Sequence, residues 1–529
     1  MPCYVDTLSM YKKQLFYLVL IAGIVRLLAA GMLELGNDEV YYYTYALHLQ
    51  SNYFDHPPGV AWLIKLFTLN LRLPQEVFIR LGSVVFATVG TYISFALGKR
   101  IKNEQTGWYA ALLYNASIYC GVIAGTFILP DSPQVLFWLA GLYYMVTAVQ
   151  YATENKKIPP AIWLAIGILN GLCIMCKVHG VFLWGGFGLY VLFCNRRLLA
   201  NPWLYVAALL TAVIISPIIT WNIQNHFVTW NYHSNRVEVK QFALDADGFI
   251  QTILGQLFYN NPLNVVAIVI ALVVLKKKVT LAKEVKQLLL LCGLPIIIIT
   301  TLVSLFKSVL PHWSGPGFLT LLFVAAAWLD DKKAQEPVAS GRTPWLIKSS
   351  LILIAVVMLG GIAFIRLLPG TIGSKEEAQY GEDDFTLDLY GWRQFGADFI
   401  PWYQQQVQAG AFKADTKIVC DKWFPAAHLD YYAARTLHIP VVGVGELNDL
   451  HHYVWLNEQR PTLQPNENAL CIVPSNYPLQ PDKIYENSFT GARLLHTFTQ
   501  TRMGQTSRYF RVYLLTGFKG QESTPLNIQ

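Results

Sequence analysis

Long apolar runs constrain this chain more than any other feature. They recur from Gln14 to Leu368 and then cease, in a chain of 529 residues. A run of about 20 apolar residues can cross a bilayer as a helix, because a helix satisfies its own backbone hydrogen bonds. Charged residues make up 14% of the chain, against about 25% in soluble domains. The pattern predicts a polytopic α-helical membrane protein and excludes a soluble enzyme, a disordered chain and a disulfide scaffold.

About eleven transmembrane helices account for the apolar runs. The predicted spans are 14–33, 77–97, 107–128, 133–151, 160–176, 181–194, 203–220, 262–275, 288–306, 313–329 and 345–367. We therefore expect a transmembrane domain over residues 1–369 and a soluble C-terminal domain over residues 370–529. The formal charges of these two parts are +11 and −4, which together give the +7 of the whole chain.

The basic residues predict the orientation in the membrane. With a cytoplasmic N-terminus, 18 of the 27 lysines and arginines in residues 1–369 fall on the cytoplasmic side, as the positive-inside rule requires. The C-terminal domain is then exported. Because these charges lie in short clusters between apolar runs, they indicate membrane topology and not a nucleic-acid partner. The first apolar run is followed by Glu34-Leu35-Gly36-Asn37, which does not resemble a signal-peptide cleavage site. The run is therefore predicted to remain in the protein as a membrane anchor.

Two outer connections, 34–76 and 221–261, are long and rich in polar residues. Long loops in a compact domain often carry function. The first contains GVAWLIKLFTLNLRL, which is typical of a helix lying in the membrane interface. Arg26 and Arg72 are interpreted as interfacial cations that extend toward the lipid headgroups.

Carboxylates in the outer connections are the candidate catalytic groups. Asp38 and Glu39 follow the first span, beside three tyrosines, where a carboxylate can act as a general base. The alternative is structural, because Asn37 is a good N-cap and acidic residues suit the next helical positions. Asp131, in the motif LPDSP, is a third candidate, with helix capping as its alternative.

The motif FDHPP holds a candidate metal ligand, Asp55, and a candidate phosphate donor, His56. The alternative is a turn without further function, since the two prolines end the preceding helix in any case.

The C-terminal domain alternates short apolar runs with amphipathic helices and is predicted to be α/β or α+β. We expect strands at 416–420, 439–444 and 469–473, a helix at 426–435 and a late edge strand at 508–514. Cys420 and Cys471 are either two buried thiols or a disulfide, which an exported domain permits. Its tryptophans could stack on sugars, with core packing as the alternative.

Five motifs occur in a fixed order along the chain: GNDEVYY, FDHPP, PDSP, CKVHG and KSVLPHWSGP. In this order they resemble the GT-C glycosyltransferases, in particular bacterial members related to protein O-mannosyltransferases and to lipid A aminoarabinose transferase. The resemblance covers residues 1 to about 368. It implies a GT-C fold in a bacterial inner membrane and an inverting transfer of a sugar from a polyprenyl-phosphate donor to a lipid, glycan or protein acceptor on the outer face.

The resemblance also implies roles for single residues. Asp38 matches the aspartate that takes the acceptor proton. Asp55 matches an acidic metal ligand and His233 a second one by spacing, so a divalent metal is an implied cofactor. His56 stands where the aminoarabinose transferase has a lysine, and a histidine is largely neutral near pH 7. His233 and Arg236 have an ordinary interfacial position as their alternative.

Departure of a polyprenyl phosphate leaves an anion at the membrane surface, which calls for preorganised positive charge. The candidate donor-phosphate residues are His56, Lys177, Arg236, Lys307 and His312. For Lys177 and Lys307 the alternative is extension toward the headgroups from a span end.

Two other classes of function remain open. The first is a transporter or flippase of lipid-linked sugars, although the sequence shows no obvious inverted repeat and little charge in mid-span. The second is a non-catalytic membrane assembly factor. Release of free polyprenyl phosphate would distinguish an enzyme from both.

Overall fold

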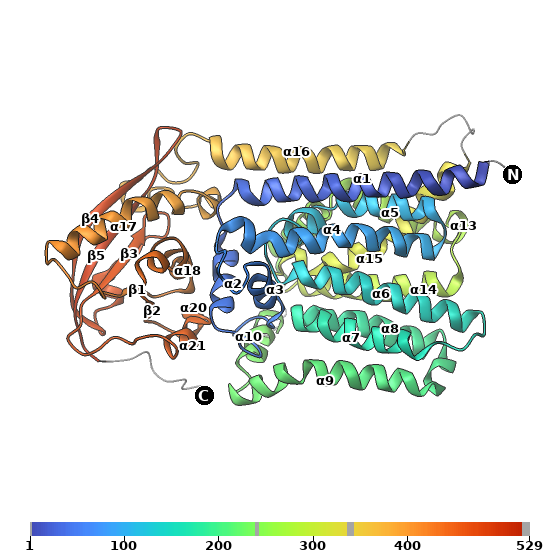
Figure 1. Ribbon diagram of the computed structural model, residues 1–529, viewed down its shortest axis with the longest axis horizontal. Coiled ribbons are helices and arrows are strands. Elements are labelled where there is room, and N and C mark those ends of the chain that lie inside the picture. Colours follow the sequence, from blue (N-terminus) through green and yellow to red (C-terminus); the bar gives the residue numbers. More distant parts are fainter. Residues whose placement is uncertain (1–2, 239–242, 336–342, 521–529) are drawn as a thin grey trace. The chain divides into compact units, whose positions relative to one another are not determined.

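The computed structural model describes residues 3–238, 243–335 and 343–520. The chain forms two compact units: residues 1–30 with 50–358, and residues 31–49 with 359–529. The first unit is helical and the second contains the sheet (Figure 1). The short segment 31–49, which carries Asp38 and Glu39, therefore belongs to the same unit as the C-terminal residues.

Long apolar helices run side by side in Figure 1. Among the described residues, six are long and apolar enough to cross a membrane. They are α1 (Cys3–Met32), α4 (Glu76–Ile101), α6 (Asp131–Thr153), α9 (Pro202–Gln224), α14 (Lys283–Val303) and α16 (Trp345–Leu367). A bent pair, α11 (Ala246–Tyr259) and α12 (Pro262–Val273), adds a seventh if it is one span, with 97° between its helices.

Each of the eleven predicted spans contains a helix, but the remaining helices are shorter or less apolar. They are α5 (Glu104–Ala116), α7 (Pro160–Cys176), α8 (Val181–Phe193) and α15 (Gly315–Ala334). The predicted span 107–128 is interrupted, because α5 ends at Ala116 and the chain continues as the π-helical turn η1 (Tyr119–Ile123). The count of eleven therefore stays a prediction.

The two long connections are largely helical. They contain α2 (Asn37–Leu47) and α3 (Gly59–Phe67) in the first, and α10 (Val228–Val237) and α11 in the second, where residues 239–242 lie outside the described residues. Helix α3 buries Leu63 and Ile64, while Trp62 and Leu66 are exposed. Exposed apolar side chains of this kind suit the interfacial position predicted for α3.

Two buried polar side chains link distant helices inside the helical unit. Arg26, predicted to lie at the interface, is instead buried, and its Nη2 donates to Asn115 Oδ1 at 2.8 Å. Asn261 Nδ2 donates to the carbonyls of Ala116 and Ser350, at 2.9 and 3.0 Å. The prediction for Arg26 was wrong because Asn115, far away in the sequence, supplies the acceptor that a buried guanidinium needs.

The second unit is built on a five-stranded sheet of order β2-β1-β3-β5-β4. Its strands are β1 (Ile418–Cys420), β2 (Val441–Gly443), β3 (Ala469–Pro474), β4 (Phe489–Arg502) and β5 (Gln505–Phe518). Strands β2, β1 and β3 are parallel, and β5 pairs antiparallel with β3 and β4. Its helices are α17 (Trp392–Gln408), α18 (Trp423–Leu429), α19 (Arg435–Leu437), α20 (Leu447–Leu450), α21 (Tyr453–Asn457) and α22 (Pro481–Ile484), with the π-helical turn η7 (Asp430–Ala434).

The sequence predicted the parallel strands but missed β4, and the expected edge strand is in fact internal. Strand β5 lies between β3 and β4, and β4 forms the edge. Most β4 side chains are exposed or half-buried, so its sequence lacks a clear apolar face. Met503 and Gly504, both with positive φ, make the turn of this hairpin. Cys420 and Cys471 are free, buried thiols.

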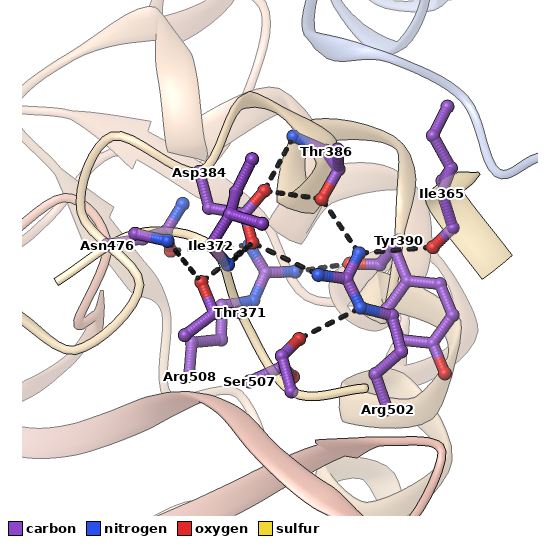
Figure 2. A network of polar contacts seen from close by, with 12 residues as sticks. Ile365, Thr371, Ile372, Asp384, Thr386, Tyr390, Asn476, Arg502, Ser507 and Arg508 are labelled. Atoms are coloured by element: carbon purple, nitrogen blue, oxygen red, sulfur yellow. Dashed lines mark hydrogen bonds and ion pairs between the residues drawn. The ribbon is translucent and has the colours of Figure 1, made fainter. Parts of the chain in front are cut away.

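A buried arginine joins the β4–β5 hairpin to the chain that follows α16 (Figure 2). Arg502 Nη2 lies 3.0 Å from Asp384 Oδ2, and both side chains are 0% exposed. The same guanidinium donates to Thr386 Oγ1 at 2.7 Å and to the carbonyls of Ile365 and Gly370. The network therefore holds residues 365–386 against the hairpin.

Candidate active site of the helical unit

A buried ion pair lies where α6 begins and α7 ends. Lys177 Nζ is 2.7 Å from Asp131 Oδ2, and both side chains are 3% exposed. The other carboxylate oxygen, Oδ1, accepts a hydrogen bond from the Tyr119 hydroxyl at 2.8 Å. Each carboxylate oxygen thus has a donor, as a buried charge requires.

Local sequence explains how the two helices present this pair. Pro130 is the N-cap residue of α6, so Asp131 stands in the first turn, where backbone N–H groups favour a carboxylate. Lys177 is the C-cap residue of α7 in extended conformation. Its carbonyl accepts from Gln134 Nε2 at 3.2 Å. Asp131 thus combines a helix-terminal position with the ion pair, whereas Lys177 is buried and does not extend toward the headgroups, which was its alternative.

Cationic and neutral basic side chains gather near this pair and influence one another's charge. We call them the cationic cluster: His56, Lys177, His179, His233, Arg236 and His312. They come from four separate parts of the chain, namely the FDHPP turn, the α7–α8 connection, α10 and the 3-10 turn η4 (Pro311–Ser314). The ring centroids of His56 and His233 are 6.0 Å apart.

The histidines of the cationic cluster that lie in connections are held neutral. Burial, followed by the charges of nearby members, lowers the pKa of His56 well below its usual value. Burial and the charges of Arg236 and Lys177 lower the pKa of His233 to about 4. Burial and Lys177 similarly lower the pKa of His312 to about 4, although Asp131 opposes the shift. A bound anion would counteract the nearby positive charges, raise the pKa of these histidines and so favour the imidazolium form.

The sequence missed two members of this arrangement, His179 and Tyr119. His179 Nδ1 is buried and has no hydrogen-bond partner within the described residues, and the ring lies 5.2 Å from that of Trp313. His179 belongs to the CKVHG motif, so the sequence did offer an indication that it lies in the site. Tyr119 lies in an apolar run without any polar neighbour to mark it.

The two other predicted cations lie at the end of α10. Arg236 is exposed, with its guanidinium carbon 5.1 Å from the centroid of the Tyr232 ring. Lys307 Nζ donates to the carbonyl of Asn235. Lys307 therefore contacts the backbone of α10, and the cationic cluster as defined above does not include it.

The implied metal ligands do not form a metal site. His233 Nε2 lies 2.7 Å from the backbone carbonyl of Asp55, and because a carbonyl accepts, this nitrogen carries the proton and cannot ligate. Across the described ranges, no group of three or more histidine, cysteine, aspartate or glutamate side chains is arranged to hold a metal ion. The described residues therefore do not fit a metal ion.

Asp38 and Glu39 lie on α2, in the unit that contains the sheet. Glu39 is buried, and its Oε2 accepts from the backbone N–H of Gly36 at 2.9 Å, so it caps α2. The N-cap residue is Gly36 and not Asn37 as predicted. Asn37 Oδ1 instead accepts from His428 Nε2 at 2.9 Å. Asp38 is exposed at the start of the helix.

The structure thus has a helical unit with apolar helices long enough to cross a membrane and with a cluster of basic side chains, and a separate α/β unit. Comparison with known proteins shows what the chain is similar to. Residues 55–221 match the family described as dolichyl-phosphate-mannose-protein mannosyltransferase. The whole fold is similar to ArnT from Cupriavidus metallidurans, solved bound to undecaprenyl phosphate, with a TM-score of 0.62 and 14% identity over 94% of this chain and 98% of that one.

A curated relative is the lipid A galacturonosyltransferase RgtD of Rhizobium johnstonii, 20% identical over 293 residues. The match covers 55% of this chain and 60% of the relative's length. The apo form of the Cupriavidus ArnT is similar as well, with a TM-score of 0.60 and 14% identity over 95% of this chain and 98% of that one. Residues 55–221 thus resemble a glycosyltransferase family, and the fold is similar to that of ArnT, in agreement with the resemblance predicted from the order of the motifs.

Proposed function

We propose that this protein is an inverting glycosyltransferase that moves a sugar from a polyprenyl-phosphate-linked donor to a lipid, glycan or protein acceptor on the outer face of a bacterial inner membrane. In this proposal the N-terminus is cytoplasmic and the C-terminal unit is exported. The observation that carries the proposal is the cationic cluster beside Asp131 in a helical membrane unit. The relatives named above, all glycosyltransferases, support it.

The reaction needs a site for a leaving phosphate. An acceptor hydroxyl oxygen attacks the anomeric carbon, the bond from that carbon to the phosphate oxygen breaks, and the polyprenyl phosphate departs with the electron pair. The negative charge that develops on the phosphate is stabilised by positive charges already in position. Lys177 and Arg236 supply fixed charge, and the neutral histidines supply hydrogen-bond donors that can take up a proton as the anion forms.

Asp131 is a positioning residue in this scheme. Its carboxylate holds Lys177 Nζ and is itself held by Tyr119. With both oxygens engaged, it is poorly placed to accept a proton from an acceptor. We do not propose Glu39 as the base, because it is buried and caps α2.

Asp38 is the proposed general base. It is the exposed carboxylate of the motif GNDEVYY and stands at the start of α2. A base at this step contributes roughly 10²–10⁴-fold. We therefore expect Asp38→Asn to lose transfer by that factor while donor binding persists.

The test is release of free polyprenyl phosphate from a polyprenyl-phosphate sugar by the purified full chain, in the presence of acceptor lipid or glycan. The wild-type protein should release it and Asp38→Asn should not. A wild-type protein that binds the donor without releasing polyprenyl phosphate would favour a transporter or flippase. More than about a tenth of wild-type turnover in Asp38→Asn would remove Asp38 from the catalytic role.

A matched pair of exposed arginines tests the phosphate site. Arg236 belongs to the cationic cluster and Arg72 does not; both are exposed. Arg236→Gln should raise the donor KM if the contact exists in the ground state, or lower kcat if it forms as the bond breaks. Equal losses in Arg72→Gln would mean that surface electrostatics, and not a phosphate site, explain the effect.

A further inference from the structure

The C-terminal unit contains a cavity that the transfer reaction does not use. Its volume is about 700 Å³, within the range of about 300–1,000 Å³ typical of small-molecule sites. It opens where the parallel strands β1 and β3 end. Asp421 and Trp423 follow β1, Asn476 and Tyr477 follow β3, and all four line the cavity.

Sheet topology makes this edge a natural binding position. From β1 the chain continues to β2 on one side of β1, and from β3 it continues to β4, which lies beyond β5 on the opposite side of the sheet. The two connections therefore leave the sheet in opposite directions, and a crevice opens between the carboxyl ends of β1 and β3. In open α/β sheets, ligands bind at such a switch point.

Aromatic rings form one side of the cavity. Phe385 is 67% exposed and Tyr477 is 38% exposed, which is unusual for large rings in a folded unit. The Tyr477 ring stands edge-on to Phe424, with centroids 4.5 Å apart, and its hydroxyl donates to Asp388 Oδ1 at 2.8 Å. Exposed ring faces of this kind offer flat apolar surface to the C–H faces of a sugar.

The rest of the lining is acidic. The carboxylates are Glu382, Asp383, Asp384, Asp388, Asp421 and Asp449, with Lys422 as the cation among the lining residues. Asp384 is bound by Arg502 (Figure 2), and Asn476 Oδ1 accepts from Arg508. Asp384 and Asn476 are therefore already paired and form part of the cavity wall. Burial raises the pKa of Asp388 and of Asp421. Carboxylates accept hydrogen bonds from hydroxyl and amino groups and repel anions.

A buried tyrosine also belongs to the lining. Tyr485 is 2% exposed, and its hydroxyl interacts with the thiol of Cys471, another lining residue. The cavity therefore combines flat apolar surface, hydrogen-bonding groups and negative charge.

We propose that this cavity binds a saccharide without anionic groups, either uncharged or amino-bearing, as the part of the acceptor that does not react. The acceptor role rests on the proposed glycosyltransferase function, whereas saccharide binding as such does not. A phosphate or uronate ligand is disfavoured because the lining is acidic.

Binding is measured first, on the full chain in detergent and without donor. The probes are chitobiose and its de-N-acetylated, amino-bearing form, with digalacturonate and inorganic phosphate as anionic controls. Saturation-transfer NMR and titration should show saturable binding of the first two and weaker binding of the controls. Equal binding of digalacturonate, or no saturable binding of any saccharide, would overturn the proposal.

Matched variants locate the site. Phe385→Ala and Asp421→Asn should each weaken binding of the preferred probe by about three- to tenfold. Their controls are Ile484→Ala, an exposed apolar residue outside the lining, and Asp482→Asn, an exposed carboxylate outside the lining. Equal losses in a control and its partner would place the binding elsewhere and refute the assignment.

A transfer assay separates this inference from the proposed function. Phe385→Ala should raise the acceptor KM and leave the donor KM unchanged. Transfer with an unchanged acceptor KM in both cavity variants would refute the acceptor role while the glycosyltransferase function stands. Saccharide binding that both variants weaken, in a wild-type protein without transfer activity, would refute the glycosyltransferase function while the binding site stands.

Discussion

At the scale of single residues, the buried pair of Lys177 and Asp131 carries the most consequence. Its two charges are removed from water and compensate one another, with Tyr119 completing the contacts of the carboxylate. Removing one partner leaves an uncompensated buried charge, whereas removing both leaves none. Single and double variants of this pair can therefore distinguish an effect on the stability of the protein from an effect on the transfer reaction.

We expect Lys177→Met to destabilise the protein by about 3–5 kcal/mol and to abolish transfer. The double variant Lys177→Met with Asp131→Asn should regain much of the stability but not the activity, because the cation is still missing. Thermal unfolding in detergent and polyprenyl phosphate release measure the two effects. As a control, Lys99→Gln breaks an exposed pair with Glu104 and should cost under about 1 kcal/mol. Activity in the double variant would contradict the assigned role of Lys177.

The neutral histidines predict a pH dependence. In the folded state the pKa of His233 and of His312 is about 4, against 6.5 for an ordinary histidine. Between these values the unfolded chain binds more protons, so stability is fully present above pH 6.5 and declines as the pH falls toward 4. Added polyprenyl phosphate should lessen this decline, because the anion stabilises the imidazolium.

Thermal unfolding from pH 7 to pH 5, with and without polyprenyl phosphate, checks this expectation. His312→Gln should flatten the pH dependence, whereas His226→Gln, which changes an exposed histidine of the same unit, should not. An effect of polyprenyl phosphate that is the same at both pH values would contradict a role for the histidines in binding the phosphate.

At the scale of elements, the β4–β5 hairpin depends on one arginine that reaches a distant segment. Arg502 of β4 is 0% exposed and binds Asp384, Thr386 and the backbone carbonyls of Ile365 and Gly370 (Figure 2). Apolar side chains of β4 such as Phe498 pack against α17. The hairpin is thus held by polar contacts in addition to packing.

Arg502→Gln should destabilise the C-terminal unit by about 3–5 kcal/mol, because Asp384 is left buried without its cation. Hydrogen exchange should then rise in β4, in β5 and in residues 370–386. Arg493→Gln removes an exposed arginine from the same strand and should change exchange little. Equal protection in both variants would show that packing alone holds the hairpin.

At the scale of the whole molecule, orientation is the property that the function needs most. The proposed acceptor chemistry takes place on the outer face, and the excess of basic residues between apolar runs predicts a cytoplasmic N-terminus and an exported C-terminal unit. The pattern of basic residues is a property of the whole chain, since no single connection establishes it.

A reporter fused after Gln529 tests this orientation. It should be active if it functions only in the exported compartment and silent if it functions only in the cytoplasm. A second fusion in the connection that contains Lys156 and Lys157, predicted to be cytoplasmic, should give the opposite result. A cytoplasmic signal from the C-terminal fusion would mean that the number of spans differs from eleven by an odd number.

The sequence by itself determined the class of this protein. Apolar runs must become helices in a bilayer because backbone groups there have no water to bind, and the order of short motifs along the chain pointed to the GT-C superfamily. Even the parallel strands of the C-terminal unit followed from local runs of apolar residues. These properties depend on neighbouring residues, which a sequence displays directly.

The tertiary structure alone decided which polar residues meet. Asp131 pairs with Lys177, 46 residues away, and His56 lies with His233 of a distant helix. Arg26 is buried because Asn115 accepts a hydrogen bond from its guanidinium. The segment that contains Asp38 belongs to the C-terminal unit. The burial and partners of a charge depend on contacts between remote segments, so its role cannot be read from its neighbours in the chain.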